Sequence, residues 1–145
     1  MKPVTTVLSL PVTDLDRSAR FYRDGLGLAP ADPDGGVVAV ELPNLSLFLI
    51  ERDEFETYLD RAGVPGRPRF ENGACILSAA IATRDEIERV VSRAISAGGT
   101  AEGPAEHDGS FTAYVRDPDG HVWELVHNEH TAEAGVDVDP GDDEA

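Results

Sequence analysis

The sequence predicts an α+β fold built from one repeated unit, in which a strand is followed by a helix and then by further strands. Several short segments alternate apolar and polar residues, which is typical of strands with one buried face. Two other segments place apolar residues at helical spacing. The order of segments occurs twice, offset by roughly 70–75 residues, and two copies favour a pseudo-symmetric pair of modules over a solenoid.

The first unit begins with a strand predicted over residues 4–12, where leucines alternate with polar residues. A helix is predicted over residues 13–27, because its apolar side chains recur at helical spacing and two glycines mark its end. Residues 35–42 and 45–51 are predicted to be strands joined by a tight Pro-Asn turn. A short helix is expected within residues 53–62, followed by a loop rich in proline and glycine.

The second unit begins with a strand predicted over residues 75–82. A helix follows over residues 83–99, and Thr83 is expected to cap it because a glutamate stands three residues later. Strands are predicted over residues 110–117 and 121–128, joined by a Pro-Asp-Gly turn.

The composition divides the chain into one domain and an acidic tail. A single domain is expected over residues 1–128, with one module at about 4–52 and the other at about 73–128. Residues 129–145 contain seven acidic side chains and no Lys or Arg, so we expect a mobile, solvated tail. The whole chain has 28 acidic and 12 basic residues, a net charge of −16. This charge argues against nucleic acid and against anionic membranes as partners.

A cytoplasmic location is expected from what the sequence lacks. The first residues do not form the sustained apolar run of a signal peptide, and no apolar run approaches the roughly 18 residues of a membrane-spanning helix. The single cysteine, Cys75, excludes an internal disulfide and fits a reducing compartment.

Several other side chains are expected to have structural roles. Trp123 is predicted to anchor the core, and Cys75 to be a small buried group. The helical arginines Arg17, Arg20 and Arg23 are interpreted as a solvent-exposed face, not as an anion site.

Two motifs in the sequence resemble those of one protein superfamily. The first is VTDL followed by FYRDGLG within residues 12–27, and the second is AGG at 97–99 followed by Tyr114, DPDGH at 117–121 and Trp123-Glu124. In their order and spacing they resemble the two modules of the vicinal oxygen chelate superfamily, which contains glyoxalase I, bleomycin-resistance proteins and extradiol dioxygenases. The resemblance implies two βαβββ modules that form a curved mixed sheet with a concave cup, and it implies a homodimer.

The resemblance also implies four metal-ligand positions, usually His or Glu, in the first and last strands of each module. These positions fall at Val7, near Phe48, at Ile76 and at Glu124. Only Glu124 is a donor, whereas a divalent metal needs several nitrogen or oxygen donors at close range. We therefore predict no cofactor and disfavour a divalent metal. A different metal site around Glu124 stays open with nearby acidic and imidazole side chains, namely His107, Asp108, His121 and His127.

Strand periodicity predicts which side chains would line such a cup. The expected pocket is apolar with few polar groups, which suits a small organic ligand. His107 is placed in the loop before the strand at 110–117. The predicted ligand-binding residues are Glu124, Tyr114, Phe48, Val7, Ser9, Ile50, Ile76, Ser78, Arg116 and His107.

Two functions remain open from the sequence. The first is binding of a small, largely apolar or cationic organic molecule without a metal, which agrees with the missing donors and the negative charge. The second is a lyase, isomerase or dioxygenase reaction of the superfamily, with Glu124 in a non-standard metal site or acting as a metal-free general base. A purely structural Glu124, or a dimeric scaffold with a vestigial pocket, is the alternative to both.

Overall fold

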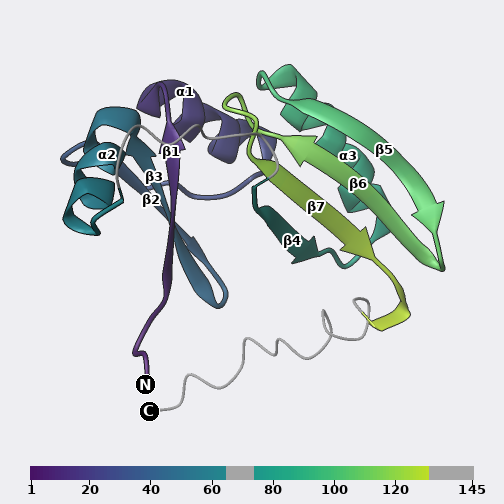
Figure 1. Ribbon diagram of the computed structural model, residues 1–145. Helices are drawn as coiled ribbons and strands as arrows, with labels where there is room; N and C mark the ends of the chain where they lie inside the picture. Colours follow the sequence, from purple (N-terminus) through teal and green to yellow (C-terminus); the bar gives the residue numbers. More distant parts are fainter. Residues whose placement is uncertain (65–73, 131–145) are drawn as a thin grey trace, which may run out of the picture.

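The strands form two sheets, one from each sequence module (Figure 1). The computed structural model describes residues 1–64 and 74–130, so residues 131–145 of the tail predicted at 129–145, and most of the proline- and glycine-rich loop, lie outside the described residues. The first sheet has the strand order β1-β3-β2, and the second has the order β4-β7-β6-β5. The predicted duplicated α+β fold is confirmed.

The first sheet contains β1 (Val7–Val12), β2 (Val37–Leu42) and β3 (Leu45–Glu51). β1 runs parallel to β3, and β3 pairs antiparallel with β2 across the predicted Pro-Asn turn. The chain between β1 and β2 forms α1 (Leu15–Arg20), which continues without a break into the π-helix η1 (Phe21–Gly25). The helix predicted over residues 13–27 is therefore present, and its second half is the wider π-helix η1.

The helix α2 (Arg52–Arg61) starts directly after β3, where a short helix was predicted. It contacts β1 and β3 and lies on the side of the first sheet that faces away from the second sheet (Figure 1). Among the described residues, none of the helices has the length and apolar character needed to cross a membrane.

The second sheet contains β4 (Ile76–Ala80), β5 (Thr100–His107), β6 (Ser110–Arg116) and β7 (Val122–His127). The helix α3 (Arg84–Ser96) connects β4 to β5, and the hydroxyl of its cap Thr83 accepts a hydrogen bond from the backbone N–H of Glu86 at 3.1 Å. The predicted helix cap is thus confirmed. β4 runs parallel to β7, and β7, β6 and β5 are joined antiparallel.

The strand β5 was missed from the sequence because it lacks a regular apolar alternation. Its register shifts between Glu102 and Ala105, and a proline follows Gly103 in this irregular stretch. His107, which we expected in a loop, is instead the last residue of β5. The first module has only an isolated bridge between Pro30 and Val40 at the corresponding place, so the βαβββ order is complete in the second module alone.

The hydrophobic core lies between the two sheets and the helices α1, η1 and α3. Trp123 is 5% exposed, as predicted, and its ring N–H donates a hydrogen bond to the fully buried Tyr22 hydroxyl at 3.3 Å. Cys75 is exposed, so the expectation that it is buried was wrong, since it lies just outside the end of β4. The remaining core comes from both modules and includes Val12, Phe21, Val38, Val40, Leu47, Leu49, Ile87, Ala94, Ala113 and Val115.

The turn between β6 and β7 joins the two modules through hydrogen bonds. Buried Asp117 accepts one from the Tyr22 hydroxyl at 2.9 Å. Asp119 accepts two from Thr13, from its backbone N–H at 3.0 Å and its hydroxyl at 2.7 Å. The Nε2 of His121 lies 2.7 Å from the carbonyl oxygen of Pro11. These contacts fix the end of β1 and the start of α1 against the second sheet.

Candidate functional site

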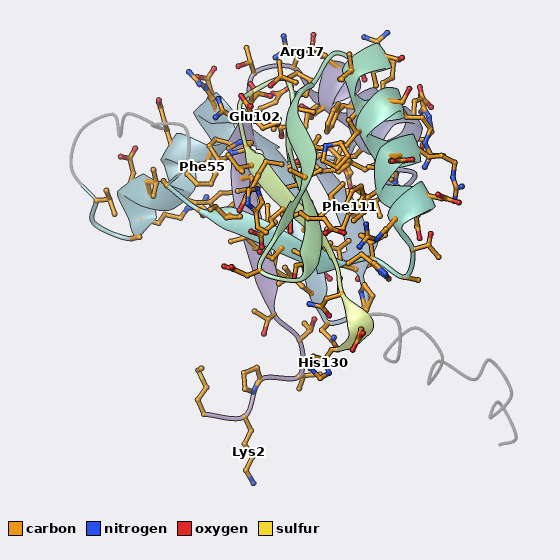
Figure 2. The ribbon with its side chains drawn as sticks, turned by 90° about the vertical axis from the view of Figure 1, so that its right-hand side faces the viewer. Lys2, Arg17, Phe55, Glu102, Phe111 and His130 are labelled. Carbon is orange, nitrogen blue, oxygen red and sulfur yellow. The ribbon has the colours of Figure 1, made fainter. Side chains whose placement is uncertain are left out.

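Each sheet has one face that packs in the core and an opposite face, called here the outer face. On the outer face of the second sheet, the register places Ser78, Glu124 and Tyr114 side by side on β4, β7 and β6. We call these three residues the polar row. Glu102 on β5, which is labelled in Figure 2, is paired with Tyr114, so the register extends the same line across the sheet.

The carboxylate of Glu124 is held from both sides by its neighbours in the polar row. The Tyr114 hydroxyl donates a hydrogen bond to Oε2 at 2.6 Å, and the Ser78 hydroxyl donates one to Oε1 at 3.0 Å. The hydrogen bond to Glu124, followed by the charge of that residue, raises the pKa of Tyr114 above its usual value. The phenol therefore remains a donor, and the oxygen lone pairs left over in the row can accept N–H or O–H groups from a ligand.

The outer face of the first sheet has a different chemistry at the matching positions. There the register aligns Ser9, Phe48 and Ala39 on β1, β3 and β2. Val7 is 42% exposed, whereas Ile50 is only 2% exposed and lies two residues before α2 begins. The first sheet thus offers apolar surface at Val7 and Phe48, whereas Ile50, on the same face, is buried close to the start of α2, which packs against β3.

Two further predicted residues flank the polar row along β6. Arg116 shares the outer face with Tyr114, and a separation of two residues places their backbones about 7 Å apart. His107 pairs with Ser110, four residues from Tyr114, which places it about 14 Å along the sheet on the same face. Within the described residues, Arg116 has no ion-pair partner. The Tyr114 end of the row therefore has a guanidinium about 7 Å away in one direction along β6 and an exposed imidazole about 14 Å away in the other direction.

A cavity of about 650 Å³ lies between the modules and was not anticipated from the sequence. Ile76 and Ser78 reach it, but Glu124, Tyr114, Val7, Ser9 and Phe48 are absent from its lining. Apart from the buried Ile50, the predicted residues are thus divided between this cavity and the two outer faces. The only sequence signal was a set of leucines near strand ends that the structure leaves half-buried, namely Leu8, Leu28, Leu42 and Leu45.

Comparison with known proteins decides the family. A family model described as the glyoxalase/bleomycin resistance protein/dioxygenase superfamily matches residues 4–125. The chain belongs to this superfamily. The match covers both modules, and the resemblance expected from the two sequence motifs is confirmed.

Relatives of this superfamily member include both sequences and solved structures. A putative lactoylglutathione lyase from Brassica oleracea var. gemmifera is 30% identical over 132 residues, covering 84% of this chain and 43% of the relative. The chain therefore matches less than half the length of that protein. A glyoxalase-related enzyme from Fulvimarina pelagi is 28% identical with a TM-score of 0.73, covering 86% of this chain and 87% of the other. A hypothetical protein of S. aureus has the same fold, with 24% identity, a TM-score of 0.76, and coverage of 88% and 94%.

The metal site implied by the superfamily does not fit the residues of this chain. On the resemblance to the superfamily, three of its four positions fall at Val7, near Phe48 and at Ile76, and the side chains of these three residues have no donor atom. At the fourth position, both oxygens of Glu124 already accept hydrogen bonds within the polar row. In residues 1–64 and 74–130, no three His, Cys, Asp or Glu side chains are grouped so that they could hold a metal ion.

The imidazoles considered for a different metal site are engaged elsewhere or distant from Glu124. The Nε2 of His121 contacts the Pro11 carbonyl, and Nδ1 of His127 lies 3.0 Å from the Ile81 carbonyl. His107 is at the far end of β5. Within the described residues, these imidazoles therefore do not form a group with Glu124 that could hold a metal ion.

Proposed function

We propose that this superfamily member binds a small organic molecule at the polar row, without the metal ion that the superfamily implies. The observation that supports this most directly is the carboxylate of Glu124, held between the hydroxyls of Ser78 and Tyr114. Both hydroxyls donate their hydrogens to Glu124, so the polar row offers hydrogen-bond acceptors to a ligand. A ligand that brings an N–H, O–H or cationic group would satisfy them.

The surroundings of the polar row support a ligand that is otherwise apolar. Ile76, beside Ser78 at the edge of the sheet, is 55% exposed. The chain's net charge of −16 attracts cations over a longer range. Arg116, about 7 Å along β6 from Tyr114, repels a positive group at that end of the row. A ligand with its cationic group at Glu124 and its uncharged part towards Ile76 therefore fits best.

The same edge strands support a homodimer as part of this proposal. β1 and β4 are each at the edge of their sheet, and each carries a large exposed apolar side chain, Val7 or Ile76. A second copy of the chain would cover this surface and satisfy the open strand edges. Light scattering coupled to size exclusion would measure the mass, and Ile76→Glu is expected to shift a dimer towards the monomer.

The test of ligand binding is a thermal-shift screen of small cationic and hydrophobic compounds. A ligand at 100 times its dissociation constant adds about 2.7 kcal/mol to the unfolding free energy. Glu124→Gln keeps the shape but removes the charge, and is expected to weaken binding about tenfold or more, because a hydrogen bond to a charged group is lost. Glu102→Gln is the matched control, since it removes a carboxylate from the neighbouring strand without altering the bonds from Ser78 and Tyr114.

Two results would contradict the proposal. The first is a Glu124→Gln variant that binds every identified ligand as tightly as the original chain. The second is a melting temperature that falls by more than a few degrees when a chelator is added, which would reveal a structural divalent metal.

A metal-free acid–base reaction is the second candidate, and one contact favours it. The 2.6 Å hydrogen bond between Tyr114 and Glu124 pairs a proton donor with a carboxylate at an accessible surface. The Brassica relative is described as a putative lactoylglutathione lyase. An assay for lactoylglutathione turnover, with and without added divalent metal, would test this candidate. Loss of turnover in both Tyr114→Phe and Glu124→Gln is the expected signature of such a reaction.

A further inference from the structure

A second polar site lies on the helical side of the molecule, where three arginines meet at the junction of α1, η1 and α3. Arg17, Arg20 and Arg93 line a cavity of about 360 Å³ together with Asp24, Ser96 and Ala97. Arg17 and Arg20 come from α1, and Arg93 comes from the last turn of α3. The sequence alone predicted an exposed arginine face on α1, and it gave no reason to bring Arg93 beside it.

Small residues at the helix crossing explain why these arginines converge. A Cβ atom added to Gly25 of η1 would lie 3.2 Å from the Cβ of Ala97 and 3.3 Å from the Cα of Ala94. The helices therefore approach each other closely at this point. Long side chains within about two turns of the crossing, such as those of Arg17, Arg20 and Arg93, can then extend over it.

The charges of the cluster are poorly compensated, although the chain has more than twice as many acids as bases. Asp24 in the lining is bound by Arg23, through Nε at 3.0 Å and a second nitrogen at 3.3 Å. In the part of the chain that the structure describes, neither Arg20 nor Arg93 forms a hydrogen bond or ion pair with a carboxylate, although the pKa of Asp24 is lowered by the hydrogen bond from Arg23 and, to a lesser extent, by the charge of Arg20.

Arg17 is only partly satisfied by its neighbours. One of its terminal nitrogens is 3.5 Å from Asp119, a carboxylate that already accepts two hydrogen bonds from Thr13. Its Nε is buried and has no hydrogen-bond partner among the described residues. Compensation of a helix dipole does not explain Arg17 or Arg20, because α1 continues into η1 and does not end there.

We propose that this arginine cluster, Arg17, Arg20 and Arg93, is a binding site for a phosphate group. Guanidinium groups bind oxyanions through pairs of parallel N–H donors. Three of them approaching from two helices match a tetrahedral anion with several oxygens better than a planar carboxylate with two. The cavity volume is at the lower end of the range for small-molecule sites, so it admits free phosphate or the phosphate end of a small organic molecule.

The site is separate from the polar row. Residues that alternate with the polar row along β6 and β7, such as Val115 and Trp123, pack into the core with α3. The arginine cluster therefore lies behind the sheet that bears Glu124 on its outer face. The test of phosphate binding therefore does not depend on the ligand proposed for the polar row.

The experiment measures binding of inorganic phosphate by calorimetry, at constant ionic strength with chloride as the reference anion. The expected result is saturable binding, with Arg20→Ala and Arg93→Ala each reducing the affinity about tenfold or more. Arg89→Ala is the matched control, because Arg89 is an exposed arginine one turn earlier on α3 and does not line the cavity. It is expected to change the affinity by less than about twofold. Binding that does not saturate, or an equal loss in Arg89→Ala, overturns the proposal.

Two further measurements distinguish the source of the phosphate and the kind of recognition. Tighter binding of a phosphate monoester than of inorganic phosphate assigns the site to a phosphorylated small molecule, and equal binding assigns it to the free anion. Arg93→Lys keeps the charge but loses the paired donors, so it is expected to bind more weakly than the original chain. Full affinity in this variant would overturn recognition by guanidinium geometry. Chemical shifts of the arginine Nε–H groups in the unmodified protein report the contact even if an alanine variant fails to fold.

Discussion

The two sheets share a framework but differ in what they present on their outer faces. In both, a first strand runs parallel to a last strand, which is joined by a hairpin to its antiparallel neighbour. The matched positions are Ser9, Phe48 and Ala39 in the first sheet, and Ser78, Glu124 and Tyr114 in the second. At these matched positions a serine is retained at the edge strand, while a carboxylate and a phenol occur in the second sheet only. The first sheet has a carboxylate one pair further along, where the Ser46 hydroxyl donates to Glu41 at 2.7 Å.

This difference shows that duplication fixes the framework and leaves the chemistry free to differ between modules. The core positions must remain apolar in both halves because they fill one shared interior. The outer positions experience no such requirement, since a hydrogen-bonded carboxylate and a half-buried phenylalanine are both tolerated at a sheet surface. Substitutions at matched positions in the two modules test this difference.

The largest expected effect comes from restoring the donors that the superfamily implies. The variant Val7→His, Phe48→Glu, Ile76→His supplies two imidazoles and a carboxylate in addition to Glu124. If the four positions converge when two copies associate, this variant should bind Zn²⁺ with a dissociation constant of about 1 μM or tighter, roughly 8 kcal/mol. The zinc content of the variant after dialysis measures this binding. Equally tight binding by the original chain would show that our interpretation of its missing donors is wrong.

The next largest effect is the loss of stability on alanine substitution in the core, at Trp123 and Leu47. These residues occupy matched places on β7 and β3. Trp123→Ala is expected to lower the unfolding free energy by about 3–5 kcal/mol, because it leaves a large cavity. It also removes the hydrogen bond to Tyr22 across the modules. Leu47→Ala removes fewer atoms and no such bond, so its cost in urea unfolding should be smaller. A larger cost for Leu47→Ala would contradict the view that Trp123 couples the modules.

The smallest effect concerns the two hairpin turns. The first turns through exposed Pro43 and Asn44, whereas the second contains Asp117, whose pKa is raised above its usual value chiefly by burial. Because the folded chain then binds this proton more tightly than the unfolded chain, the stabilising contribution is present at low pH. It is lost as the pH rises from the usual carboxyl pKa through the raised value.

Asp117→Asn removes this titrating group and is expected to make the unfolding free energy fall less with rising pH in that range. Urea unfolding at a series of pH values measures the slope. Asp32→Asn, at an exposed position in the first module, serves as the control. The same pH slope in Asp117→Asn as in the original chain would show that the buried turn does not titrate as described.

Most of the fold could be predicted from the sequence, and the exceptions have physical causes. Apolar periodicity and the Thr83 cap sufficed for α3, and the turn residues sufficed for both hairpins. β5 could not be predicted because its pairing depends on the neighbouring strand β6 and tolerates an irregular, polar sequence. The exposure of Cys75 depends on where β4 begins, which sequence patterns define only to within a few residues.

For the candidate site, periodicity correctly placed Glu124, Tyr114 and Ser78 on one face, since alternation along a strand is a local property. The hydrogen bonds among them depend on the register of β4, β6 and β7. The burial of Ile50 depends on the packing around the start of α2, and the convergence of Arg93 with Arg17 and Arg20 depends on a helix crossing at Gly25. None of these follows from local spacing.

The sequence by itself determined the duplicated modules, the identity of the core side chains and the lack of donors at three of four superfamily positions. These are properties of residue type and local periodicity, and any packing of the chain retains them. Only the tertiary structure decided which side chains meet: the three hydroxyl and carboxyl groups of the polar row, the buried turn at Asp117, and the arginines over the helix crossing. Such meetings depend on register and on the distance between elements, which are set by the packing of residues far apart in the chain.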